Sequence, residues 1–258
     1  MNELSVGIIQ SKLHWEDPVA NRKMLESKIV SIASDSNLII LPEMFTTGFT
    51  MSASALAEEM EGTTLDWMRS LASDLNTAIT GSIIVKEKRK FYNRLYFVFP
   101  DGSYHWYDKK HTFTLAGEHK TYTAGNEKLI VDFHGWKICP LICYDLRFPV
   151  WARNIEDYDL LIYVANWPKK RISAWDALLR ARAIENMSYC VGVNRIGLDG
   201  NNHEYVGHSA VYNVLGDLIS EADNEKEFSE IVVLSKEHIH NTRKQLQFLN
   251  DRDAFSLI

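Results

Sequence analysis

The sequence predicts an α/β fold in which two β-sheets pack face to face with helices outside them, in the layer order α-β-β-α. Short apolar stretches alternate with amphipathic helical patterns along nearly all 258 residues. Two of these stretches, residues 38–41 and 160–164, are continuously apolar, which is typical of strands buried on both faces. No Pro/Ser-rich linker, low-complexity tract or tandem repeat divides the chain. We therefore expect a single domain over residues 1–258, although the pattern alone also fits a three-layer α/β sandwich.

The N-terminal half alternates strands with helices. Residues 4–9 alternate in character as a strand does. Asp17 and Pro18 then supply an N-cap and a first-turn proline for a helix, and Pro42 ends the apolar strand 38–41. The remaining elements expected in this half are a helix over residues 64–75 and strands over residues 78–85, 91–99 and 104–107.

The C-terminal half continues the same alternation. We expect strands over residues 129–133 and 136–142, a buried strand over 160–164, a helix over 173–187, and strands over 189–194, 208–214 and 230–234. The tail, residues 248–258, ends in an apolar segment from Phe255 to Ile258, which would be unusual if it were exposed. We expect this tail to contact a partner subunit.

Composition argues against several classes of protein. With 28 basic and 34 acidic residues, the net charge of −6 does not suit a nucleic-acid partner. The N-terminus lacks the basic region of a signal peptide, and no window of eighteen apolar residues predicts a membrane span. Three cysteines are too few and odd in number for a disulfide framework. A cytoplasmic protein is expected.

Cys143 is the first candidate for chemistry, because it follows an apolar strand and precedes a helix start at Pro149. A thiol at a strand-to-helix turn feels the positive helix N-terminus, which favours the thiolate. Such a turn also directs the side chain outward, as the nucleophile elbow of serine hydrolases does. A buried structural cysteine fits Cys143 about equally well. For Cys139 and Cys190, which lie inside apolar strands, the structural interpretation is preferred.

A thiol nucleophile needs a base, and none of the nine histidines has a suitable setting. A partly desolvated carboxylate can serve instead, because burial makes it a stronger base. Glu43 directly follows the buried strand 38–41, where α/β folds present functional groups. Lys110 follows the aromatic strand 104–107. Taken alone, Glu43 is by default a surface carboxylate at a strand end, and Lys110 is a solvated charge.

Three segments together resemble the catalytic segments of the nitrilase superfamily. They are LPEMF (41–45), DKKHTF (108–113) and LICYDLRFP (141–149), and they occur in the family's order of Glu, Lys and Cys. The resemblance extends to residues 117–118, 166–168, 180–186 and 207–209, and so covers roughly the whole chain. Any one motif is weak, but three in the correct order are specific.

The resemblance implies a four-layer αββα sandwich of the nitrilase type with a Glu-Lys-Cys triad. Carried over residue by residue, Glu43 is the base, Lys110 the electrostatic stabiliser and Cys143 the nucleophile. Glu118 resembles the family's second glutamate, which orients the others. The doublet of Lys109 and Lys110 is ambiguous, since strand alternation points the two in opposite directions. The family spacing favours Lys110.

The mechanism implied is amide hydrolysis through a Cys143 thioester. The Lys110 ammonium and the Tyr144 backbone N–H are expected to stabilise the oxyanion, and no metal or organic cofactor is needed. A dry pocket would strengthen these interactions. Four aromatic residues could form its wall, although ordinary core packing is an equal alternative for each: Phe45, Phe113, Tyr144 and Trp167.

Within the superfamily, the motifs look most like the ω-amidase branch and its bacterial YafV-type hydrolases, which cleave the terminal amide of short dicarboxylic monoamides such as 2-oxoglutaramate and succinamate. Such a substrate requires a cation for its far carboxylate. Arg147 is the candidate, because a guanidinium fits a carboxylate bidentately. A structural ion pair of Arg147 with Asp145 or Glu118 is the slightly preferred alternative.

Other functions remain open from the sequence. Another branch of the superfamily, an N-carbamoyl amide hydrolase or a nitrilase, would carry the same triad. A metal or redox protein built on Cys139 and Cys143 is disfavoured, because the spacing is not C-x-x-C and no second cysteine pair exists. A non-catalytic binding module is disfavoured because the triad residues are all present. The resemblance also implies a homodimer or a higher homo-oligomer.

Overall fold

The computed structural model describes residues 1–221, 223 and 225–256. Its larger sheet contains the strands β1 (Glu3–Gln10), β2 (Leu38–Ile40), β3 (Glu58–Glu59), β4 (Ala78–Glu87), β5 (Lys90–Val98), β6 (Tyr104–Asp108) and β14 (Phe228–Ser235). Their order is β14-β1-β2-β4-β5-β6, and β3 pairs with β4. The central strands β1, β2 and β4 are parallel, while the outer pairs β1–β14, β4–β5 and β5–β6 are antiparallel. The strands β2, β4 and β6 therefore end at the same edge of the sheet.

The second sheet comprises β7 (Val131–Phe133), β8 (Trp136–Ile142), β9 (Leu160–Val164), β10 (Tyr189–Val193) and β13 (Ala210–Tyr212). The order is β13-β10-β9-β8-β7, with β8, β9 and β10 parallel to one another. A separate two-stranded ribbon pairs β11 (Ile196–Leu198) with β12 (Glu204–Val206). Buried side chains of both large sheets form one cluster between them, with Leu95 and Phe97 from one sheet and Ile142 and Ile162 from the other.

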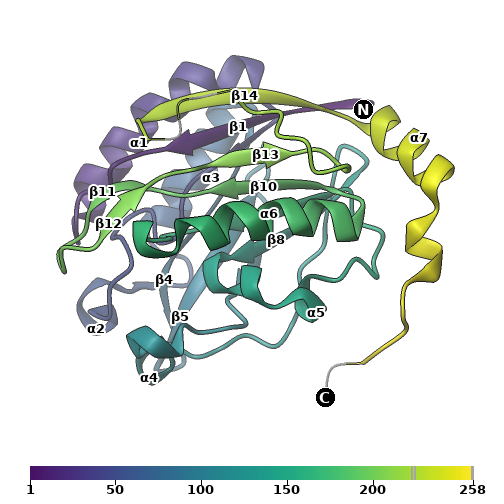
Figure 1. Cartoon of the computed structure of the whole chain (residues 1–258). Helices are drawn as coiled ribbons and strands as arrows, with labels where there is room; N and C mark the ends of the chain where they lie inside the picture. The colour runs from purple at the N-terminus through teal and green to yellow at the C-terminus, as the bar shows by residue number, and fades with distance from the viewer. Residues whose placement is uncertain (222, 224, 257–258) are drawn as a thin grey trace.

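Helices cover the outer faces of both sheets (Figure 1). On the larger sheet, α1 (Pro18–Ile32) and α3 (Thr63–Leu75) bury Leu25, Ile29, Leu65 and Met68 in a second core. On the other sheet, α6 (Ile172–Asn186) buries Trp175. The shorter helices are α2 (Ala53–Leu56), α4 (Glu118–Thr121), α5 (Pro149–Ala152) and α7 (Lys236–Leu246). The α-β-β-α order is confirmed, and a three-layer sandwich is excluded.

Element boundaries follow local chemistry. The helix α1 begins as predicted, with the Asp17 side chain accepting from the backbone N–H of Ala20 and Pro18 in the first turn. The strand expected over residues 208–214 is shorter, because His208 has a positive φ of 60° and β13 starts only at Ala210. A residue in the left-handed region cannot continue an extended strand.

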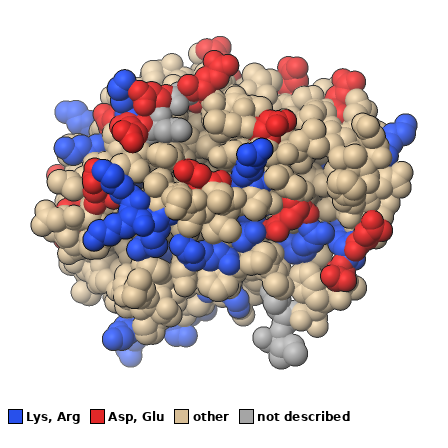
Figure 2. Space-filling view, viewed as in Figure 1, with Lys and Arg blue, Asp and Glu red and all other residues tan. Residues whose placement is uncertain are grey.

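The C-terminal tail and one charged face of the molecule complete the description of the fold. Phe248 and Phe255 in the tail are 58% and 37% exposed, while Ile258, part of the expected apolar end, lies outside the described residues. No helix in the described part of the chain is both long and apolar enough to cross a membrane. On the face that α6 crosses, Figure 2 shows Lys and Arg side chains gathered in a band, with Asp and Glu side chains around it.

Candidate active site

Three segments distant in the sequence meet where β2, β6 and β8 end. Glu43 follows β2 after Leu41 and Pro42, Lys109 directly follows β6, and Cys143 directly follows β8. Parallel strands that end at one edge bring such residues together without any special loop. The fold therefore assembles a carboxylate, an ammonium group and a thiol from the ends of three strands.

The Glu43 carboxylate is fully buried and held from both sides. Its Oε1 accepts from Lys109 Nζ at 2.8 Å and from Asn93 Nδ2 at 2.8 Å, and its Oε2 accepts from the Asn166 backbone N–H at 2.8 Å. The Asn166 side chain also donates to the Glu43 carbonyl. With three donors on two oxygens, the carboxylate has one fixed orientation. Glu43 lies where the sequence analysis expected a site residue.

The structure places Lys109, and not Lys110, in this cluster, so the expectation for Lys110 is wrong. Lys109 is 1% exposed, and its Nζ also lies 3.0 Å from Glu118 Oε2. Burial opposes the charged ammonium, but the carboxylates of Glu118 and Glu43 outweigh it and raise the pKa of Lys109. Lys110 Nζ points elsewhere, 5.2 Å from the centre of the Trp151 ring.

Glu118 lies at the start of α4, where its carboxylate is also fully buried. It accepts from Lys109 Nζ and from the Phe113 backbone N–H, and Asn93 Nδ2 lies 3.5 Å from its Oε1. Burial raises the pKa of Glu118, with Lys109 opposing and Glu43 adding to the shift. Glu118 thus contacts both Lys109 and the Phe113 backbone, and its role as an orienting second glutamate stays a prediction.

Cys143 opens a short 3₁₀ helix, Cys143–Arg147, with a positive φ of 43°. Non-glycine residues in this region cost roughly 1–3 kcal/mol and concentrate at functional sites. Burial and the Glu43 carboxylate raise the pKa of the Cys143 thiol well above its usual value, and Lys109 only partly opposes them. The expectation that the turn favours the thiolate is therefore wrong. Cys143 is half-buried at the cavity wall, and a protonated thiol beside a carboxylate needs that carboxylate as its base.

The Asp145 carboxylate ties the Cys143 segment to the Lys109 segment. Its Oδ2 accepts from the Tyr107 hydroxyl at 2.7 Å and from the Ile142 backbone N–H at 3.1 Å. Its Oδ1 accepts from the His111 backbone N–H at 2.9 Å and lies 2.8 Å from His111 Nδ1. Asp145 lies two residues after Cys143, and His111 two residues after Lys109, so this contact fixes the relative position of the two segments.

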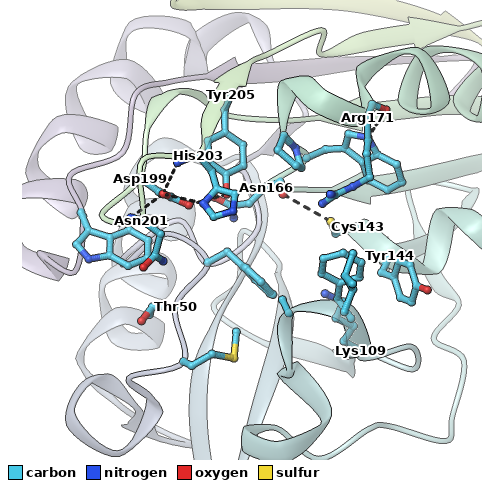
Figure 3. A pocket seen from close by; sticks show the side chains of 18 of the residues that line it. Thr50, Lys109, Cys143, Tyr144, Asn166, Arg171, Asp199, Asn201, His203 and Tyr205 are labelled. Carbon is cyan, nitrogen blue, oxygen red and sulfur yellow. Dashed lines mark hydrogen bonds and ion pairs between the residues drawn. The ribbon is translucent and has the colours of Figure 1, made fainter.

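A cavity of about 610 Å³ opens above this cluster, and Cys143 and Lys109 line it (Figure 3). The predicted wall residues Phe113, Tyr144 and Trp167 also line it. Phe45 does not, so that expectation is wrong. Phe45 is fully buried in the core between the larger sheet and its helices, with its ring centre 6.0 Å from that of Trp67.

Two arginines line the same cavity. The Arg147 guanidinium carbon lies 5.0 Å from the centre of the Trp167 ring, and that of Arg171 lies 4.9 Å from the centre of the Phe113 ring. Neither Asp145 nor Glu118 pairs with Arg147; their contacts go to His111 and Lys109 instead. The structural ion pair considered as an alternative for Arg147 is thus absent from the described residues.

The sequence analysis did not single out Asn93, the side-chain role of Asn166, or Arg171. Asn93 offered a signal, since an asparagine within the apolar strand 91–99 would be buried and need partners. Arg171 gave no such signal, because it is the last of three consecutive basic residues, after Lys169 and Lys170, and such a run is typical of a solvated surface. Cys139 and Cys190 are fully buried, as predicted. Among the residues described, no group of three or more His, Cys, Asp or Glu side chains could hold a metal ion.

Comparisons with known proteins agree with this geometry. The family model described as carbon-nitrogen hydrolase matches residues 5–244. The chain is 43% identical to Omega-amidase YafV of Escherichia coli (strain K12), covering 100% of both chains, and 31% identical to the 2-oxoglutaramate amidase of Bacillus subtilis (strain 168), covering 86% of this chain and 87% of that one. A crystal structure of XC1258 from Xanthomonas campestris, described as a CN-hydrolase superfamily protein with an arsenic adduct in its active site, superposes with a TM-score of 0.97 at 42% identity, over 100% of both chains.

Proposed function

The chain belongs to the carbon–nitrogen hydrolase family, and on that premise we propose that it is a thiol amidase of the ω-amidase type. It hydrolyses the terminal amide of short dicarboxylic monoamides, such as 2-oxoglutaramate and succinamate, to the acid and ammonia. The observation that carries this proposal is the buried contact of Glu43, Lys109 and Glu118 beside Cys143. The cavity at this contact is lined by Arg147 and Arg171, which form no ion pair with any residue that the structure describes. Two relatives named as an omega-amidase and a 2-oxoglutaramate amidase support the substrate class.

In the first half of the reaction, Glu43 accepts the thiol proton as Cys143 Sγ attacks the amide carbonyl carbon. This assignment fits the raised pKa of Cys143, because the thiol is protonated until the substrate arrives. Glu43 then donates the proton to the amide nitrogen, the carbon–nitrogen bond breaks, and ammonia leaves. The acyl group remains on Cys143 as a thioester.

In the second half, Glu43 accepts a proton from water, and the resulting hydroxide attacks the thioester carbonyl. The carbon–sulfur bond breaks, the acid leaves, and Glu43 returns the proton to Cys143 Sγ. The fixed orientation of Glu43 by Asn93, Lys109 and Asn166 lets one carboxylate serve both halves. The protons balance without a metal or organic cofactor.

Both tetrahedral intermediates carry an oxyanion. We assign its stabilisation to the Lys109 ammonium and the Tyr144 backbone N–H, which flank the nucleophile. A preorganised donor of this kind contributes about 3–4 kcal/mol to transition-state stabilisation in a dry site. The two carboxylates around Lys109 keep its ammonium charged and in place. The Lys110 role implied by the resemblance therefore passes to Lys109.

Arg147 is proposed to bind the far carboxylate of the substrate. Its guanidinium lies over the Trp167 ring and lines the cavity, so its N–H edge is available to a ligand. Arg147→Ala is expected to raise KM for succinamate by roughly 10- to 100-fold, because a charge-assisted hydrogen bond is lost. Steady-state kinetics with butyramide, a neutral amide of the same chain length, provide the comparison. An equal rise in KM for both amides would reject this role.

The direct test of the proposed function is ammonia release from a panel of substrates. We expect the wild-type protein to turn over 2-oxoglutaramate and succinamate with kcat/KM at least about tenfold above that for butyramide. An N-carbamoyl amine and an aliphatic nitrile should be poor substrates. Faster turnover of the carbamoyl compound or the nitrile would assign the chain to another branch of the family, and no turnover of any member would indicate a binding module.

Assembly and location form part of the same proposal. We propose a homodimer or higher homo-oligomer, supported by exposed apolar side chains such as Val150 in α5 and Ile184 in α6, which are 49% and 47% exposed. The tail, residues 248–258, is proposed as a further subunit contact of a single domain over residues 1–258. Three free cysteines support a reducing cytoplasm.

A further inference from the structure

The cavity is lined by two guanidinium groups, those of Arg147 and Arg171, for which the described residues supply no counter-charge. Among the residues the structure describes, neither Arg147 nor Arg171 forms an ion pair, whereas the buried Arg94 pairs with Asp108 at 2.7 Å. Each of the two lies against an aromatic ring, which leaves the N–H edge of the guanidinium free to donate. An unpaired cation in a half-enclosed site is costly unless a ligand compensates it.

The third cation of the cavity cannot serve a distant substrate group. Lys109 Nζ already contacts Glu43 at 2.8 Å and Glu118 at 3.0 Å. Its positive charge is thus already compensated by two protein carboxylates, and these contacts hold it in the Glu43 cluster. A carboxylate at the other end of the substrate must therefore be recognised by the arginines.

A single loop positions both arginines. The Trp167 indole N–H donates to the Arg171 carbonyl at 2.8 Å, and the Arg171 backbone N–H donates to the Pro168 carbonyl at 3.0 Å, which closes residues 167–171 into a compact turn. The side-chain oxygen of Asn194 also fixes this turn by accepting from the backbone N–H of Trp167 at 2.8 Å. The face of the same Trp167 ring supports Arg147. Arg171 is thus held on a rigid element, as specific recognition requires.

The charge of the cavity is distributed unequally. Among the described lining residues, the acids are Glu16 and Asp199, and Asp199 accepts from Tyr205 at 2.9 Å. In Figure 3, Asp199 lies across the cavity from Arg171 and Cys143. A substrate carboxylate is repelled from the acidic side and attracted to the arginine side. The basic band seen in Figure 2 adds a longer-range attraction for anions.

We propose that Arg171 is a specificity-determining residue that binds the substrate carboxylate together with Arg147. The cavity would then select short amides that carry a carboxylate at the end opposite the scissile bond, with two guanidinium groups sharing that carboxylate. This inference rests on the proposed amidase function and deepens it. The proposed role applies to Arg171 and not to its neighbours Lys169 and Lys170, because the two lysines are exposed and do not line the cavity.

The test compares Arg171→Gln and Arg171→Lys with Lys170→Gln, which removes the same charge one residue away. Kinetics are measured with succinamate and with butyramide. For Arg171→Gln we expect kcat/KM for succinamate to fall roughly 10- to 100-fold through KM, and that for butyramide to change by less than about threefold. For Arg171→Lys, kcat/KM for succinamate should lie between the values for the wild type and Arg171→Gln, because lysine keeps the positive charge but cannot donate two parallel hydrogen bonds to a carboxylate. Lys170→Gln should match the wild type.

A double variant, Arg147→Gln with Arg171→Gln, tests whether the two residues share one carboxylate. Its loss on succinamate should differ from the product of the two single losses by more than about twofold, since groups that bind the same ligand atom are coupled. Equal losses on both amides, an unchanged succinamate KM in Arg171→Gln, or strictly multiplicative losses in the double variant would overturn the inference. A wild-type protein that does not prefer succinamate over butyramide would overturn the proposed substrate class itself, which is a different result from an Arg171 variant that keeps the wild-type preference.

Discussion

Lys109→Met is expected to lower kcat by at least about 10³-fold, whereas Lys110→Met should leave kcat within about twofold of the wild type. Lys109 is the cation beside the nucleophile, and its replacement removes the charge that stabilises the oxyanion. It also leaves Glu43 and Glu118 buried next to each other without a counter-charge, which costs about 3–5 kcal/mol of stability. The Lys110 ammonium lies 5.2 Å from the centre of the Trp151 ring and so takes no part in the cluster of Glu43, Lys109 and Glu118.

The measurement is kcat for succinamate together with the thermal unfolding midpoint of each variant. Since Lys109→Met lowers stability as well as activity, turnover is compared at a temperature where circular dichroism shows the variant to be folded. The matched variant at position 110 has the same change in charge and volume. If Lys110→Met lost activity while Lys109→Met kept it, the proposed mechanism would be assigned to the wrong side chain.

The lysine doublet shows why the sequence could locate the cluster without resolving its members. Alternation along 104–108 predicts that Lys109 shares a face with Tyr107, but aromatic residues occupy both faces of this strand, so its inward face was undetermined. In the structure, Tyr107 is 1% exposed and Trp106 43% exposed, which sets Tyr107 and Lys109 inward. The burial of Tyr107 between the two sheets therefore determines that Lys109, and not Lys110, faces the cluster. That packing is a property of the tertiary structure and cannot be read from the sequence of the strand alone.

The same distinction applies to the rest of the site. Local features marked Glu43 as a strand-end residue and Cys143 as a turn residue, and the resemblance of three ordered segments to the nitrilase superfamily selected both as candidates. The hydrogen bonds from Asn93 to Glu43, and from His111 to Asp145, join residues 50 and 34 positions apart. Their partners are set by how strands pair across two sheets. Phe45 was misplaced for a similar reason, because an aromatic residue beside a catalytic glutamate can face either the cavity or the core.

Cys143→Ala is expected to abolish hydrolysis, with kcat lowered by roughly 10⁴- to 10⁶-fold, as happens when a hydrolase loses its nucleophile. Lys109 and Tyr144 would still polarise a bound amide, but no group could form the thioester. The variant should stay folded, because the thiol lines the cavity and its loss leaves no void in the core. Isothermal titration should still detect succinamate binding, since Arg147 and Arg171 are intact.

Cys139→Ala is the matched control, because Cys139 is fully buried, four residues earlier in the chain, and does not line the cavity. It should retain turnover with a modest loss of stability from the small cavity created. In the wild type, iodoacetamide should alkylate Cys143 and spare Cys139 and Cys190. The rate should continue to rise with pH beyond about 9, because burial and the Glu43 carboxylate raise the pKa of Cys143 and so postpone formation of the thiolate. Retained turnover in Cys143→Ala, or an alkylation rate that levels off near pH 7, would contradict a protonated thiol activated by a neighbouring carboxylate.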